Sequence, residues 1–159
     1  MNTQAFWAFS LEFYGRDGVA SACMTLQDAC GADVDVVLFA LWCASRGTRL
    51  RVSNLDSICA TVASWHLRVV QSIRQARGGL KPAPPAPFCA LAAEALRQSL
   101  LAAELEAERL QHCAMEALAP PPGVDDPVEA AVDNLACFAR HAGIPPDAAP
   151  FAALLKVFP

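Results

Sequence analysis

The chain has 159 residues, of which 55% are hydrophobic and 18% are charged. This composition excludes global disorder, which needs few hydrophobic residues and a high net charge. The formal net charge of −4 argues against a nucleic-acid-binding face, because such a face needs clustered Lys and Arg. Uninterrupted apolar runs fall short of the ~20 residues that span a bilayer, so we expect no membrane span. We expect a single folded domain over residues 1–159.

The N-terminus and the cysteines predict a reducing, cytoplasmic location. The opening MNTQAFWAFSLEF lacks the basic start and the small-residue cleavage site of a signal peptide. Seven cysteines are present, an odd number, and none forms a CxxC pair. Most fall at apolar helix positions, where a free Cys behaves as a small hydrophobic residue. The pattern therefore indicates thiols rather than a disulfide framework.

Glycine, proline and capping residues divide the chain into helices, and strand signals are nearly absent. The expected helices cover, in chain order, about 3–14, 18–30, 33–46, 54–79, 88–118 and 127–143. The first would start at Thr3, and Asp17 can cap the second. The Pro-rich segments 81–87 and 119–127 are expected to be loops, and the tail after Pro150 can form a last short helix.

The expected helix 33–46 is apolar around nearly its whole circumference when its residues are placed ~100° apart. It should therefore be buried, and the predicted fold is an all-α, irregular bundle of about six helices around it. Asp33 and Asp35 stand at its start. An N-cap acceptor and a first-turn carboxylate satisfy free N–H groups and complement the helix dipole. Capping accounts for both, although a carboxylate pair beside Cys30 also suits a metal or acid–base site.

The stretch from Trp7 to Trp42 combines an aromatic-Ser-Leu-x-x-Tyr opening with Gly-Val, Leu-Gln-Asp and Gly-Ala-Asp-Val-Asp motifs before an apolar Leu-Trp helix. It resembles the N-terminal signature of a proteobacterial family of small helical proteins of unknown function. The resemblance covers the N-terminal half and implies a bacterial source and a helical domain. It implies no activity, cofactor or catalytic residue. Asp35 stands where we expect Asn more often in this family, which suits a capping or hydrogen-bonding position.

His66 projects into an apolar stripe of the expected helix 54–79, so it should be buried and needs hydrogen-bond partners. One interpretation is a core histidine held by a carboxylate or a backbone carbonyl. The other is a base or ligand whose pKa is set by burial and an acidic neighbour. We expect one of three carboxylates, or a backbone carbonyl, within hydrogen-bond reach of His66. The three carboxylates are those of Asp35, Glu104 and Glu108.

Glu104 and Glu108 lie four residues apart on one flank of the expected helix 88–118, a like-charge pair that favours a cation between them. The cations that can supply this charge are Arg97, Arg68, Arg74 and Arg77. His112 follows Glu108 at a spacing that can bind metal, but the Glu-x-x-His motif of di-iron bundles is missing. A solvated flank with interhelical ion pairs is therefore favoured, and we predict no metal ligands and no cofactor.

Two function classes remain, and neither comes with an assigned catalytic residue. His112 and Cys113 point apart on a helix, and the chain has no Gly-rich phosphate loop and no GxSxG motif. The favoured class is a non-catalytic, cytoplasmic interaction module, because each candidate residue has an adequate structural role. The alternative is a small-molecule- or metal-binding protein, or an enzyme, with its site in the bundle core. The candidate residues for that site are His66, Glu104, Glu108 and Asp35.

The aromatic first helix is the expected docking face, because it carries more large apolar residues than one packing face holds. We therefore expect a homodimer or a protein partner at this helix. The residues concerned are Phe6, Trp7, Phe9, Phe13 and Tyr14.

Overall fold

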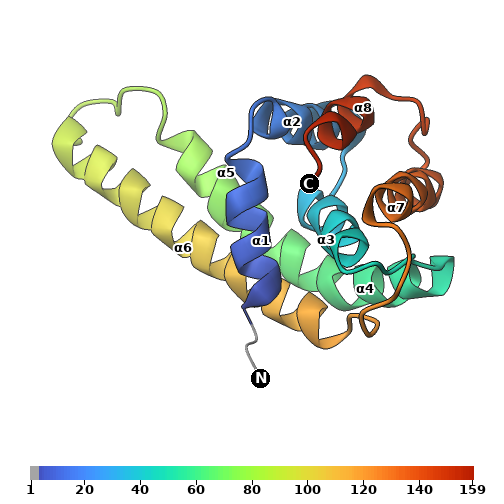
Figure 1. Ribbon diagram of the computed structural model, residues 1–159. Helices are drawn as coiled ribbons and strands as arrows, with labels where there is room; N and C mark the ends of the chain where they lie inside the picture. The colour runs from blue at the N-terminus through green and yellow to red at the C-terminus, as the bar shows by residue number, and fades with distance from the viewer. Residues whose placement is uncertain (1–3) are drawn as a thin grey trace.

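The computed structural model describes residues 4–159 as a bundle of helices (Figure 1), and no strand occurs in that range. The helices are α1 (Ala5–Tyr14), α2 (Val19–Cys30), α3 (Val34–Ser45), α4 (Val52–Trp65), η1 (His66–Val70), α5 (Gln71–Gly79), α6 (Ala90–Ala117), α7 (Pro127–Ala142) and α8 (Ala149–Lys156). The all-α prediction is confirmed. The expected helix start at Thr3 lies outside the described residues. In the described range, no helix has the length and apolar character needed to cross a membrane.

The predicted helix 54–79 is correct in extent but is not a uniform α-helix. It begins at Val52 and changes after Trp65 into the π-helical turn η1. At the end of this turn the Gln71 N–H donates to the carbonyl of His66, five residues earlier. Such wide turns inside α-helices are rare and occur frequently at functional sites. No sequence pattern used above anticipates this turn.

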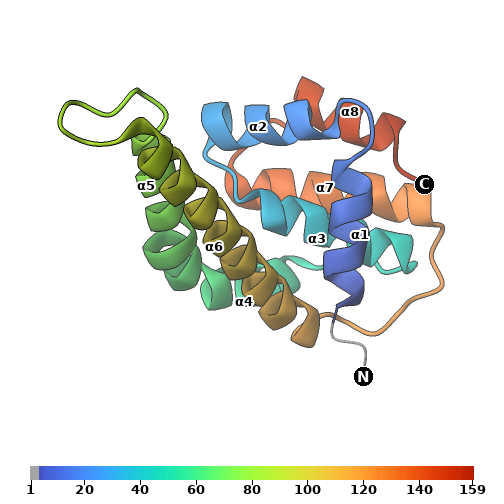
Figure 2. The ribbon, with the colours of Figure 1, turned by 90° about the vertical axis from the view of Figure 1, so that its left-hand side faces the viewer.

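α3 is the central helix, as predicted, and every residue from Val36 to Ala44 is buried. α7 packs along it, while α1 and α6 contact it from other directions. Figures 1 and 2 show α2 and α8 lying together over α3 and α7, and α5 and α6 forming a long hairpin to one side. The predicted cap is also present, because Asp33 Oδ1 accepts the Asp35 N–H at 3.0 Å. Asp17 does not cap α2, whose N-cap is Gly18.

Asn134 on α7 forms hydrogen bonds that hold the turn after α3 in place. Its Oδ1 accepts the Leu50 N–H at 2.7 Å, and its Nδ2 donates to the carbonyls of Ala40 and Thr48 at 3.0 and 2.9 Å. The side chain is fully buried. Because its acceptor and both its donor hydrogens are used within the fold, this amide is explained by structure alone.

The aromatic residues of α1 are largely used inside the chain. Phe6 and Phe13 are buried, and the Phe6 ring packs against Phe39 with centroids 5.4 Å apart. Trp7 is half-buried, and Tyr14 is 40% exposed. The apolar surplus that motivated a docking face on α1 is therefore smaller than the sequence indicates, and the partner itself stays a prediction.

Candidate functional site

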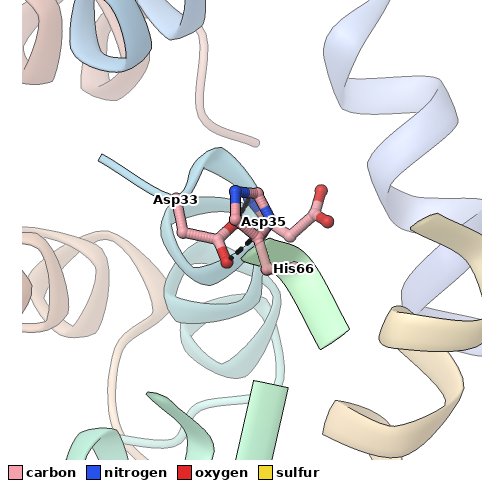
Figure 3. Close-up of side chains that lie close together, drawn as sticks. All are labelled: Asp33, Asp35 and His66. Carbon is pink, nitrogen blue, oxygen red and sulfur yellow. Dashed lines mark hydrogen bonds and ion pairs between the residues drawn. The ribbon is translucent and has the colours of Figure 1, made fainter. Parts of the chain in front are cut away.

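Three side chains from two elements converge beside the start of α3 (Figure 3). Asp33 and Asp35 flank the first residue of α3, and His66 is the first residue of η1. One potential ligand atom from each lies within 4.8 Å of the other two. His66 Nδ1 is 3.3 Å from Asp33 Oδ2, but the pair is not aligned as a hydrogen bond. We call these three residues the Asp–His cluster.

The carboxylate paired with His66 is that of Asp33, so the expectation of Asp35, Glu104 or Glu108 is wrong. The alternative, a backbone carbonyl, does not accept from His66 Nδ1 within residues 4–159 either. The interpretation of Asp33 as a cap was correct but incomplete, because a carboxylate has two oxygens. Oδ1 accepts the backbone N–H of α3, which leaves Oδ2 facing His66. The cap therefore orients the second oxygen into the cluster.

Gln111 on α6 joins the two aspartates. Its Nε2 donates to Asp33 Oδ2 at 3.2 Å and to Asp35 Oδ2 at 2.9 Å. The side chain is 2% exposed, and its Oε1 has no hydrogen-bond partner within residues 4–159. A buried acceptor left unpaired costs ~1–3 kcal/mol, so a purely structural account of Gln111 is incomplete. No sequence motif points to Gln111.

His112, the next residue on α6, lies on the other side of Asp35. Its Nε2 is 3.0 Å from Asp35 Oδ1, and its ring stacks on Phe6 with centroids 4.1 Å apart. It is 2% exposed, and neither ring nitrogen makes an aligned hydrogen bond to the described part of the chain. The sequence spacing relates His112 to Glu108 and to Cys113, whereas the structure turns it toward Asp35.

Glu104 and Glu108 are held by arginines of α5, as one of the sequence alternatives predicted. Arg74 Nε is 2.9 Å from Glu104 Oε1, and Arg74 Nη2 is 2.8 Å from Glu108 Oε1. Arg77 also donates to Glu104. Arg97 pairs with Glu94 instead. The prediction of a solvated flank is wrong for Glu104, which is 4% exposed, because α5 packs over this side of α6.

A pocket of about 720 Å³ lies between α1, α2, α3, α5 and α6. Small-molecule sites commonly measure ~300–1,000 Å³. Polar residues in its wall include Asp35, Arg74, Glu104, Glu108 and His112. Apolar residues in its wall include Trp7, Leu11, Met24, Leu38 and Leu105. Three of the four site residues proposed from sequence therefore line one pocket, while His66 lies outside it.

The family comparison agrees with the resemblance seen in the N-terminal half. Residues 5–115 match the model of a family described as "Protein of unknown function (DUF2390)". The chain belongs to this family. The proteobacterial origin stays an expectation. No curated protein and no solved structure matches the chain. The part that matches DUF2390 contains the Asp–His cluster and every residue of the pocket wall, whereas α7 and α8 lie beyond it.

Four carboxylates and three cationic side chains line this DUF2390 pocket. Burial and the nearby charge of Asp35 raise the pKa of Glu108 to about 7, which Arg74 only partly opposes. Burial and Asp35 likewise raise the pKa of Asp33 to about 6, against the opposing effect of His66. At Glu104 burial also acts upward, but the hydrogen bonds from Arg77 and Arg74 overcome it and lower the pKa. The arrangement therefore suits a positively charged or hydrogen-bond-donating ligand.

Proposed function

We propose that the protein binds a small amphipathic organic amine in the α1–α6 pocket. The observation that carries this proposal is a pocket with a mainly apolar wall in which four carboxylates outnumber three cationic side chains. The carboxylates are those of Asp28, Asp35, Glu104 and Glu108, and the cations are those of Arg74, Arg77 and Lys81. Small-molecule binding is the alternative function predicted from the sequence. Its site here is the pocket, which includes Asp35, Glu104 and Glu108 but not His66.

The apolar body of the ligand would lie against Trp7, Leu11 and Leu105. These side chains line the pocket and leave room for a chain of several carbon atoms. Burial of apolar surface contributes ~0.8 kcal/mol per CH₂ group. An alkyl or aryl group of modest size would therefore supply much of the affinity.

The amino group would face Glu108 and Asp35. Among the described residues, Glu104 pairs with both Arg77 and Arg74, whereas Glu108 pairs with Arg74 alone. Among residues 4–159, no Arg or Lys forms an ion pair with Asp35. A protonated amine would supply the missing positive charge and a hydrogen-bond donor, which favours it over a carboxylate of the same length.

The proposal is tested by calorimetric titration of the full chain with octylamine and, separately, with octanoate. We expect saturable binding of octylamine at one site per chain and binding of octanoate at least tenfold weaker. Met24→Trp narrows the pocket at a position that is already 52% exposed, so the fold should tolerate it. Leu91→Trp is the matched control, because Leu91 is 84% exposed and does not line the pocket.

The expected result is loss of octylamine binding in Met24→Trp and unchanged binding in Leu91→Trp. Equal affinity for octylamine and octanoate would refute the amine preference. Octylamine binding that survives in Met24→Trp would refute the pocket as the site.

A cytoplasmic location and a protein partner at α1 stay as secondary proposals. The odd number of cysteines supports the first. Half-buried Trp7 and exposed Tyr14 support the second, although both also line the pocket and so have a role without a partner.

A further inference from the structure

We infer that Asp33, Asp35, His66 and Gln111 form a binding site for one divalent cation of the Mn²⁺ type. The site lies behind the pocket wall, because Asp35 alone of the four lines the pocket. The inference therefore does not rest on the proposed amine. It rests on the positions of the ligand atoms and on the buried Gln111 amide.

The separation of the ligand atoms fits a cation with a small movement of side chains. Potential ligand atoms of Asp33, Asp35 and His66 all lie within 4.8 Å of one another. Oxygen and nitrogen ligands lie ~2.0–2.6 Å from common divalent ions, so two of them on one ion are at most ~4–5 Å apart. Two of the atoms come from the start of α3, and the third comes from the turn η1.

Gln111 supplies an independent indication, because its amide donates to both carboxylates and so holds them together as a cation would. Its Nε2 lies within 3.2 Å of both Asp33 Oδ2 and Asp35 Oδ2, while its Oε1 is buried without a partner in the described range. Rotating the amide by half a turn exchanges donor and acceptor. With a cation present, Oε1 would turn inward as a fourth ligand. Without one, the N–H groups separate the two negative charges.

His112 would orient Asp35 rather than bind the ion. Its Nε2 lies on the Oδ1 side of Asp35, opposite the Oδ2 atom that faces Gln111. Side chains that hold a carboxylate ligand in this way tune affinity without touching the metal.

The ligand set selects the class of ion. Three oxygens and one imidazole nitrogen suit Mn²⁺, because carboxylate and carbonyl oxygens favour hard cations while imidazole favours transition metals. Mn²⁺ is also the better probe. The exposed thiols of Cys30 and Cys89 would compete for softer ions such as Zn²⁺.

The test is a titration of the full chain with MnCl₂, in buffer without thiols or chelators, with free Mn²⁺ measured by electron paramagnetic resonance. We expect one Mn²⁺ per chain. Asp33→Asn should weaken binding more than tenfold while keeping the helix cap, because Asn caps as well as Asp. His66→Gln should weaken it similarly, and Gln111→Met should weaken it about tenfold.

The matched control is Asp56→Asn. Asp56 also faces a histidine, with its Oδ1 3.3 Å from His141 Nδ1, but it is 62% exposed and lies outside the cluster. Removing the Asp56 carboxylate should leave Mn²⁺ binding unchanged. Circular dichroism should show that each variant is folded. Absence of saturable binding to the wild-type chain would overturn the inference. So would equal affinity in Asp33→Asn or, if that variant does not fold, in Gln111→Met.

Discussion

Two buried side-chain amides in this protein, Asn134 and Gln111, lie beside opposite ends of α3 and differ in how their hydrogen bonds are met. Asn134 makes three bonds to backbone groups and has no unused polar atom. Gln111 makes two bonds, both to carboxylates, and its oxygen is buried without a partner within residues 4–159. The first amide completes the fold. The second borders the Asp–His cluster.

This difference distinguishes a polar side chain that is buried to stabilise the fold from one that is buried at a binding site. A polar side chain kept for stability should end with its donors and acceptors paired, because each unpaired atom costs ~1–3 kcal/mol. At the start of α3, Gln111 and His112 both keep unpaired atoms, and the pKa of nearby Asp33 is raised to about 6. Perturbed groups of this kind cluster at binding and catalytic sites.

The largest effect is expected at Asn134. Replacing it with Leu keeps the volume but leaves the buried Leu50 N–H without its acceptor and removes two further bonds. We expect a loss of about 3 kcal/mol in the free energy of unfolding, measured by urea denaturation. Gln111→Met should cost clearly less without metal, because within residues 4–159 the Gln111 side chain bonds only to carboxylates and to no backbone group. A larger cost for Gln111→Met would break the distinction between the two amides.

A smaller loss is expected at Glu104, which is buried and holds two arginines. Glu104→Gln leaves these partly buried charges undercompensated, and we expect a cost of about 2 kcal/mol. Because the folded-state pKa of Glu104 is lowered, its contribution is present above the ordinary pKa and is lost as pH falls below it. Glu94→Gln, which removes an exposed partner of Arg97 on the same helix, should leave the urea midpoint unchanged. Equal losses of unfolding free energy in Glu104→Gln and Glu94→Gln would contradict the claim that burial makes the ion pairs of Glu104 stabilising.

The last effect is a change of stability with pH, and it is set by Glu108. Its pKa in the folded protein is about 7, above the ordinary 4.5, so the folded state holds a proton that the unfolded state loses. This contribution is full below the ordinary pKa and disappears as pH rises through about 7. Between pH ~5 and ~8, the melting temperature of Glu108→Gln should therefore fall less than that of the wild type. A parallel fall in both proteins would show that Glu108 is not desolvated.

Much of the fold could be predicted from local pattern, because helix ends and apolar faces are determined by residues that are close together in the sequence. Asp33 was identified as the cap of α3, and Arg74 and Arg77 were among the cations expected beside Glu104. The expected helices are present, the short tail helix is α8, and the π-helical turn divides one predicted helix.

The site could be predicted only in part, because it depends on how α3, η1 and α6 are placed against one another. Asp35, Glu104 and Glu108 were named, but the partner of His66 was wrong. Gln111 carried no signal, since a glutamine in the middle of a helix is ordinary until its neighbours are known. The sequence likewise does not show what the second oxygen of a capping aspartate contacts. Only the packing of α6 against the start of α3 reveals what both residues face.

The central claim is that the polar groups at the start of α3 are arranged for a cation. It is tested most directly by anomalous diffraction from crystals soaked in MnCl₂. We expect one peak ~2.0–2.6 Å from Asp33 Oδ2, Asp35 Oδ2 and His66 Nδ1. The Gln111 amide should be turned so that Oε1 faces the ion, and Asn134 should be unchanged. A map with no peak there, or with its strongest peak at Asp56 and His141, would contradict it.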